Sequence, residues 1–182
     1  MQDAQTDDAP VATAKNDQSP AGTSMVGRAV TIRRPVGEVY GYFREFSNLP
    51  TFMENVERVE QLGGGRSHWV VKAPAGATVE WHARLTEEVE NEVLAWETEE
   101  GADVPNAGRV TFRDAGERGT VVTATISYEP PAGFIGKVVA KMFQREPAIQ
   151  ARRDLRRFKQ LMETGEIATN ATTRQQLEKE GR

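Results

Sequence analysis

The chain has 182 residues, 38% hydrophobic and 27% charged, which is the composition of one ordinary globular domain with tails rather than of two domains. It contains no cysteine, which excludes a disulfide framework, a thiolate nucleophile and a cysteine-ligated metal. Its formal net charge of −4 provides no global attraction to nucleic acid or to an anionic membrane.

Residues 1–24 are rich in Asp, Gln, Ala, Thr and Ser, with no aromatic residue and no periodic apolar face. Such a stretch cannot bury enough surface to offset its ordering entropy, so we expect a disordered tail. It has acids where a signal peptide needs a positive charge, and the chain has no apolar run long enough to span a membrane. We therefore expect a cytoplasmic protein.

The folded region begins with a strand and two short helices. Residues 26–32 favour a strand, and Pro35 is suited to the first turn of a helix. Ser47 is a suitable N-cap for a second short helix. The apolar residues of the first helix recur at helical spacing and form one stripe, composed of Val36, Val39, Tyr40 and Phe43.

Six further strand-like runs follow, separated by turn sequences, and one polar face on each predicts antiparallel hairpins with one side of the sheet in water. Trp69, Trp81 and Trp96 fall on three successive runs, and we expect them to share the buried face. The six runs are residues 56–62, 67–72, 78–90, 93–98, 108–113 and 120–128.

The chain ends in a helix and a tail. An apolar segment, 134–143, precedes Pro147, which we expect to start a fresh helix because proline is excluded from helix interiors. Gly165 is suited to end that helix, and the polar residues 168–182 are expected to form a flexible tail. The helix carries one narrow apolar seam, composed of Ala148, Ala151, Leu155, Phe158 and Met162.

The order of these elements predicts the architecture. A sheet with one apolar face must cover that face, and the last helix is the only long amphipathic helix available. Long sheets also curl. We predict an α+β domain over residues 25–167, in which a curved antiparallel sheet of about seven strands wraps around the long C-terminal helix.

Short motifs at both ends of this region resemble a known family. They are Ala29-Val30-Thr31-Ile32, Pro35-Val36, Val39-Tyr40, Phe46-Ser47-Asn48-Leu49-Pro50 and the helical string from Leu155 to Ile167. These residues resemble the polyketide cyclase/dehydrase family of the START-like (SRPBCC, helix-grip) superfamily, and the closing helix is similar to that of many bacterial members. The resemblance covers about residues 25–167. It implies a helix-grip fold with a cavity for apolar ligands between sheet and helix, but one scaffold hosts many functions.

We expect the inward strand residues and the helix seam to line a cavity for a small hydrophobic ligand, such as a lipid, a quinone or a polyketide-like molecule. In the alternative interpretation, the same side chains fill a closed core. The candidate lining residues are Phe52, Trp69, Val71, Trp81, Ala83, Trp96, Phe112, Tyr128, Leu155 and Phe158.

The apolar segment before the last helix is a candidate lid, or a surface that touches a membrane transiently while ligand is exchanged. In the alternative interpretation, it packs against the edge of the sheet. Its apolar residues are Phe134, Ile135, Val138, Val139, Met142 and Phe143.

The residues that could support catalysis are sparse. His68 and His82 each neighbour a tryptophan within a strand, so both are expected on the solvent face. The paired carboxylates at 87–88 and 99–100 adjoin predicted turns and are interpreted as solvated strand ends. The sequence contains no catalytic constellation, phosphate loop or cluster of metal ligands, so we expect neither a cofactor nor a metal.

Three classes of function follow. The leading hypothesis is a non-catalytic binding or carrier protein. The second is an aromatic polyketide cyclase or dehydratase, which needs inward polar groups; Arg84 and Tyr128 are the candidates, although Arg84 has the wrong strand parity to share the face of Trp81. The third is an interaction module for a ribosome or membrane surface. It would use the basic face of the last helix, whose charges lack the interleaved aromatic residues of a nucleic-acid site: Arg152, Arg153, Arg156, Arg157 and Lys159.

Overall fold

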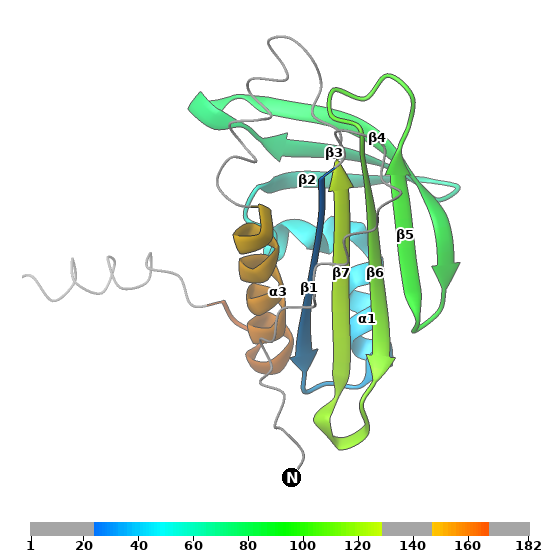
Figure 1. The fold of residues 1–182 in the computed structure, drawn as a ribbon, viewed down its shortest axis with the longest axis vertical. Helices are drawn as coiled ribbons and strands as arrows, with labels where there is room; N and C mark the ends of the chain where they lie inside the picture. Colours follow the sequence, from blue (N-terminus) through cyan, green and yellow to red (C-terminus); the bar gives the residue numbers. More distant parts are fainter. Residues whose placement is uncertain (1–23, 129–146, 168–182) are drawn as a thin grey trace, which may run out of the picture.

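The computed structural model describes residues 24–128 and 147–167. The expectations for residues 1–23, for the C-terminal tail and for segment 134–143 therefore concern residues outside these ranges, whereas Ser24, expected in the N-terminal tail, begins the first strand. The elements follow the predicted order (Figure 1): β1 (Ser24–Ile32), α1 (Val36–Arg44), the 3-10 helix η1 (Phe46–Thr51), β2 (Val56–Gly63), β3 (Arg66–Lys72), η2 (Pro74–Gly76), β4 (Thr78–Val89), β5 (Val93–Thr98), β6 (Asn106–Asp114), η3 (Gly116–Arg118), β7 (Thr120–Tyr128) and α3 (Pro147–Thr164).

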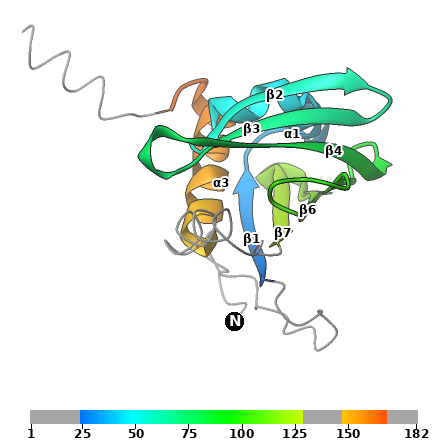
Figure 2. The ribbon, with the colours of Figure 1, turned by 90° about the horizontal axis from the view of Figure 1, so that it is seen from above.

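The strands form one seven-stranded sheet in the order β1-β7-β6-β5-β4-β3-β2, and every neighbouring pair is antiparallel. The consecutive strands β2 to β7 are joined as hairpins, while β1 returns to pair with β7. Strands β2, β3 and β4 cross the direction of β1, β7 and β6 (Figure 2), so the sheet curls and encloses a concave face. The predicted helix-grip fold of the α+β class is confirmed.

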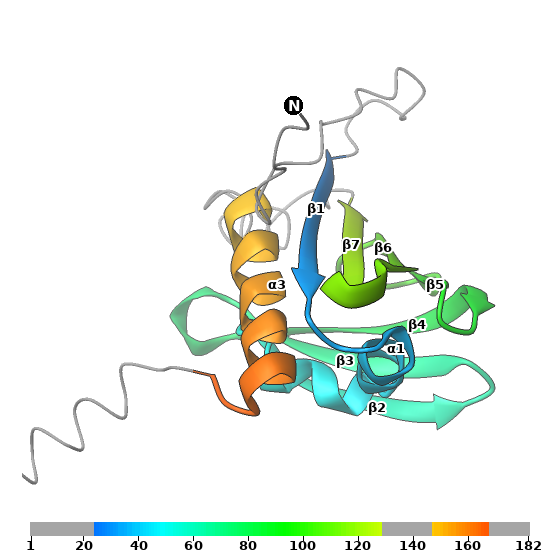
Figure 3. The same cartoon turned by 90° about the horizontal axis from the view of Figure 1, so that it is seen from below.

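The last helix, α3, is the element that the sheet grips. It lies alongside β1 (Figures 1 and 3), and its seam residues Leu155 and Phe158 are buried in the core. The helix begins at Pro147, as predicted. Gly165 follows its last turn with a φ of 76°, and its N–H donates to the carbonyl of Leu161 at 2.8 Å. That left-handed conformation favours glycine, which explains why the helix ends here.

The C-terminal end of α3 is tied to the connection between β1 and α1. The Arg34 guanidinium donates from Nε to the carbonyl of Met162 at 2.8 Å, and the backbone N–H of Arg33 donates to the Glu163 carboxylate at 2.7 Å. Carbonyls in the last turn of a helix have no partner within the helix, so the Arg34 contact satisfies one of them. The last turn of α3 is therefore fixed against the start of the domain.

The predicted N-cap at Ser47 is wrong. Ser47 lies inside η1, and its hydroxyl donates to the Glu45 carboxylate at 2.6 Å. Glu45 both ends α1 and precedes η1. The chain thus passes from one helix to the next through a single residue and leaves no extended position at which Ser47 could act as a cap.

Candidate functional site on the concave face

Three tryptophans form a stack on the concave face. Trp69 of β3 is directly opposite Trp81 of β4, with ring centroids 6.3 Å apart and ring planes 16° apart. Trp96 of β5 stacks on Trp69 at 5.9 Å and 18°. Trp69 and Trp96 are buried, and Trp81 is half-buried. The prediction that the tryptophans share one buried face is confirmed.

Aromatic rings from the helices fill the concave face next to this stack. Phe158 of α3 stacks on Phe52 with centroids 4.4 Å apart. Phe46 of η1 meets Trp69 and Trp96 edge to face at 5.7 and 5.6 Å. Rings interlocked at such distances leave little space between them. This part of the concave face is a packed core.

The predicted lining residues fall into two hydrophobic clusters. Trp81 packs partly against both clusters, and Val71 belongs to the second. Tyr128 is the last residue of β7, and its side chain lies outside the described part of the structure. The main cluster contains the other candidates, namely Phe52, Trp69, Ala83, Trp96, Phe112, Leu155 and Phe158.

The second cluster lies on the β3–β4 hairpin, which extends past α3 (Figure 3). Val71 and Val79 pair across the two strands, and Val104 from the β5–β6 connection packs on them with 1% of its surface exposed. No described residue of α1, η1 or α3 belongs to this cluster. The apolar concave face therefore continues beyond the part that the described helices fill. The sequence did not single out Val104, because it is an isolated apolar residue between turn residues.

The outer face of the sheet carries the histidines. His68 and His82 lie opposite each other on β3 and β4, and their rings stack with centroids 4.9 Å apart. Because strand residues alternate between faces, both point away from the tryptophans, as expected. His82 is exposed, whereas His68 is half-buried, with its Nε2 3.1 Å from the Glu80 carboxylate and its Nδ1 3.7 Å from that of Glu60. His68 is therefore flanked by two carboxylates and by the ring of His82.

Two of the paired carboxylates also lie on the outer face. Glu87 is exposed and Glu99 is half-buried, and they form ion pairs with Arg109 and Arg66, the latter at 2.6 Å. The hydrogen bond from each arginine lowers the pKa of the carboxyl it contacts. Each pair therefore reaches across one intervening strand: Glu87 and Arg109 lie on either side of β5, and Arg66 and Glu99 lie on either side of β4.

Arg84, one of the two polar residues considered for catalysis, does not face the concave side of the sheet. Arg84 pairs with Glu97 at 2.6 Å on the outer face, which is consistent with its strand parity and removes it as a group that could orient an interior substrate. Within residues 24–128 and 147–167, no three His, Asp or Glu side chains are placed to hold a metal ion. None of the helices in these ranges is long and apolar enough to cross a membrane.

An open cavity of about 860 Å³ adjoins the β4–β5 turn. Of the predicted cavity-lining residues, only Phe112 touches it. Most of its wall comes from outer-face and turn residues, including Val89, Glu90, Val93, Arg109, Thr111 and Thr123. This open cavity, which is lined by charged residues, is distinct from the apolar concave face.

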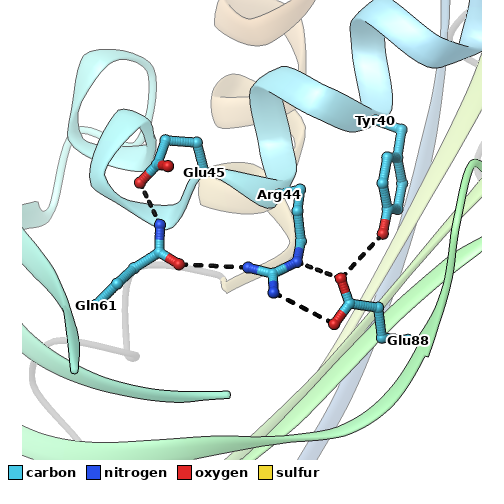
Figure 4. A network of polar contacts seen from close by, with 5 residues as sticks. All are labelled: Tyr40, Arg44, Glu45, Gln61 and Glu88. Atoms are coloured by element: carbon cyan, nitrogen blue, oxygen red, sulfur yellow. Dashed lines mark hydrogen bonds and ion pairs between the residues drawn. The ribbon is translucent and has the colours of Figure 1, made fainter. Parts of the chain in front are cut away.

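A polar network joins α1 to strands β4 and β2 (Figure 4). The Tyr40 hydroxyl donates to the Glu88 carboxylate at 3.2 Å, and Arg44 binds both oxygens of that carboxylate. Arg44 also donates to the Gln61 amide oxygen at 3.3 Å. The hydrogen bond from Arg44 lowers the pKa of Glu88, whereas burial, and then the negative charge of Glu88, raise the pKa of Tyr40. The sequence pattern assigned Tyr40 only to an apolar stripe and did not predict this network.

The substitution Glu88→Gln is expected to lower the pKa of Tyr40. The change removes the negative charge that disfavours the tyrosinate, while the burial of the ring remains. Spectroscopic titration of tyrosinate, with Tyr40→Phe to identify the signal, measures the shift. Glu87→Gln on the adjacent outer-face position is the matched control and should leave this pKa unchanged. A Tyr40 pKa that does not fall in Glu88→Gln would contradict the assigned cause.

Asp154 of α3 is a half-buried residue whose carboxyl lies next to the segment that follows η1. Its Oδ1 accepts hydrogen bonds from the backbone N–H of Glu54 at 3.3 Å and from the Gln150 side-chain amide at 2.9 Å. Burial outweighs these hydrogen bonds and raises the pKa of Asp154 to about 6. The ionised carboxylate therefore opposes the contact between α3 and this segment at neutral pH.

Asp154→Asn is expected to change how stability depends on pH. Because the folded pKa lies above the ordinary value of 3.8, the wild type loses stability from this group as pH rises from about 4 to about 6. The neutral variant lacks that loss. Its free energy of unfolding should match that of the wild type near pH 4 and exceed it by up to about 3 kcal/mol above pH 6. Urea unfolding across this pH range measures the difference, and a difference independent of pH would refute the assignment.

The comparisons with known proteins agree with this geometry. Residues 25–163 match the family described as polyketide cyclase / dehydrase and lipid transport. The chain is 33% identical over 141 residues to an uncharacterised 17.2 kDa protein of Streptomyces lincolnensis, covering 77% of this chain and 90% of that one.

Solved structures show the same fold. A crystal structure from Deinococcus radiodurans has 37% sequence identity and a TM-score of 0.65, covering 79% of this chain and 99% of that one. The Zhui aromatase/cyclase of a Streptomyces species has 16% identity and a TM-score of 0.59, covering 80% and 99%. The second likeness concerns the fold alone.

Proposed function

Because the chain belongs to the polyketide cyclase/dehydrase and lipid transport family, we propose that it is a non-catalytic binding or carrier protein for a small hydrophobic ligand. The ligand, of the lipid, quinone or polyketide-like class, lies between the concave face of the sheet and α3. A location in the bacterial cytoplasm and a transient membrane contact remain predictions of the sequence.

The second cluster is the observation that supports this proposal. The main cluster is packed with aromatic rings, so it offers little room for a ligand. Beyond it, Trp81, Val71 and Val79 continue the apolar face on a hairpin to which the described helices contribute no cluster residue. An apolar wall with few polar groups is typical of sites for small hydrophobic molecules. We therefore assign the ligand to the Trp81 end of the concave face.

Native mass spectrometry of protein purified without detergent tests the proposal, with organic extraction to identify the bound molecule. We expect an apolar molecule to co-purify. The variant Val79→Phe, which adds bulk on the concave face, should reduce its occupancy at least about fivefold because inserted volume competes with the ligand. Glu80→Phe introduces the same side chain at the next residue on the outer face, and its occupancy should equal that of the wild type.

Two results would count against this function. One is protein that carries no apolar molecule and binds none of the fatty acids, quinones or polycyclic aromatics offered to it. The other is equal loss of ligand in Val79→Phe and Glu80→Phe, which would place the bound molecule elsewhere or reflect only a loss of folding.

A further inference from the structure

Trp81 carries a polar atom that the described residues leave unsatisfied. The indole Nε1 is buried, and within residues 24–128 and 147–167 it has no hydrogen-bond partner. The ring lies on the concave face between the two hydrophobic clusters, stacked on Trp69. An indole nitrogen can only donate, so the missing partner must be an acceptor.

The neighbouring tryptophan shows how the chain satisfies the same group elsewhere. The Nε1 of Trp69 donates to the hydroxyl of Ser67 at 2.9 Å. Ser67 stands two residues before Trp69 on the same strand, so both side chains share the concave face. The corresponding position for Trp81 is Val79, and two residues after Trp81 stands Ala83. Neither side chain can accept a hydrogen bond, so β4 offers no counterpart of Ser67.

A buried donor without an acceptor destabilises a protein, so such groups are rare unless something outside the chain satisfies them. We propose that the Trp81 indole N–H is the hydrogen-bond donor for an oxygen of the bound ligand. The ligand is then an apolar molecule that carries an acceptor oxygen, such as a ketone, a quinone or an ester, rather than a pure hydrocarbon. Trp81 is thus a residue that selects among apolar ligands. This inference rests on the proposed function.

The aromatic surroundings indicate how the ligand is oriented. The stacked rings of Trp81 and Trp69 have planes 16° apart, and Val71, Val79 and Val104 add an apolar wall without polar side chains. A ligand on this wall loses hydrogen bonds to water from its oxygen. It recovers one only if that oxygen meets Nε1, which fixes its position on the wall.

A matched pair of planar probes tests the proposal. Fluorenone and fluorene share one ring system, but only fluorenone has a carbonyl oxygen. Equilibrium dialysis gives the ratio of their dissociation constants for the wild type and for protein in which Trp81 is replaced by benzothienylalanine. That residue substitutes sulfur for the N–H and keeps the shape of the ring. The same replacement at Trp69, whose N–H bonds to Ser67, is the control.

We expect the preference for fluorenone over fluorene to fall about fivefold in the Trp81 analogue, because the analogue loses one neutral hydrogen bond. The preference should stay unchanged in the Trp69 analogue. If both probes bind and the ratio does not change, the inference fails while the binding function stands. If neither probe binds, the binding function fails for planar ligands, and the inference fails with it.

A second measurement needs no variant protein. In the wild type with nitrogen-15-labelled tryptophan, fluorenone should shift one indole N–H resonance downfield, and fluorene should not. Equal shifts from the two probes at all the indole resonances would overturn the proposal even if the analogues do not fold.

Discussion

Replacing Phe158 by alanine is expected to lower the free energy of unfolding by about 3–5 kcal/mol, the usual cost of deleting a fully buried aromatic ring. Phe158 has 0% of its surface exposed. It stacks on Phe52 at 4.4 Å and meets Phe43 of α1 at 5.7 Å, so it joins α3 to α1 and to the residue that follows η1. The cavity left behind lies among aromatic rings that cannot all move to fill it. The variant should therefore lose stability because α3 no longer packs tightly against α1 and the residue that follows η1.

Chemical unfolding followed by tryptophan fluorescence measures this loss. Arg153→Ala is the matched control. Arg153 is exposed on the same helix, so its replacement changes a side chain of α3 and leaves the core intact. We expect a change within about 0.5 kcal/mol for the control. Since alanine has the highest helix propensity, a similar loss in both variants could not come from a weakened helix, and it would contradict the assignment of the loss to burial of the Phe158 ring.

Gly108→Ala is expected to displace Trp96 and to destabilise the protein by about 1–3 kcal/mol, the usual range for overpacking. A Cβ atom at position 108 would lie 2.2 Å from the six-membered ring of Trp96, which sits directly opposite on β5. The indole occupies the space that a side chain at position 108 would need, and it cannot retreat freely because the ring centroids of Trp69 and Phe46 lie 5.9 and 5.6 Å from its own. A single methyl group should therefore disturb the whole tryptophan stack.

The emission maximum of tryptophan fluorescence and the near-ultraviolet circular dichroism report on this displacement. Gly27→Ala is the control, since a Cβ there meets its nearest atom, the hydroxyl of Thr125, at an ordinary 3.7 Å. It should leave both spectra unchanged. Wild-type spectra and stability in Gly108→Ala would mean that the indole moves aside easily, and that the stack is loosely held.

The fold could be predicted from the sequence because each element has a local signal. The alternation in residues 78–90 specifies one apolar face of a strand, and the helical spacing of the seam that contains Leu155 and Phe158 specifies one apolar face of a helix. Each apolar face must be buried against another element, so the two faces predict that the sheet packs on the helix. The prediction for Ser47 was wrong because a serine caps a helix only if the residues before it leave it in an extended conformation, and its own local sequence does not specify that path. Pro147 and Gly165, by contrast, act through their own backbone chemistry, and both bounds were confirmed.

The candidate site was harder to predict than the fold. Strand parity correctly grouped Trp69, Trp81 and Trp96, but it cannot tell which of them the helices cover. That distinction depends on Phe46, which reaches the stack from η1, and on Val104, which lies far along the chain from β3. Ion pairs such as that between Arg44 and Glu88 likewise join residues whose separation gives no local pattern.

The bond between Arg33 and Glu163 spans 130 positions, and β1 finds its partner strand only at residues 120–128. During synthesis on the ribosome, the hairpins from β2 to β7 can assemble in order as they emerge. Strand β1 emerges first but can pair only after β7 has been synthesised. Contacts of such long sequence separation slow folding, because the loop must close before any of them forms. The concave face thus acquires its final wall only when nearly the entire chain has left the exit tunnel.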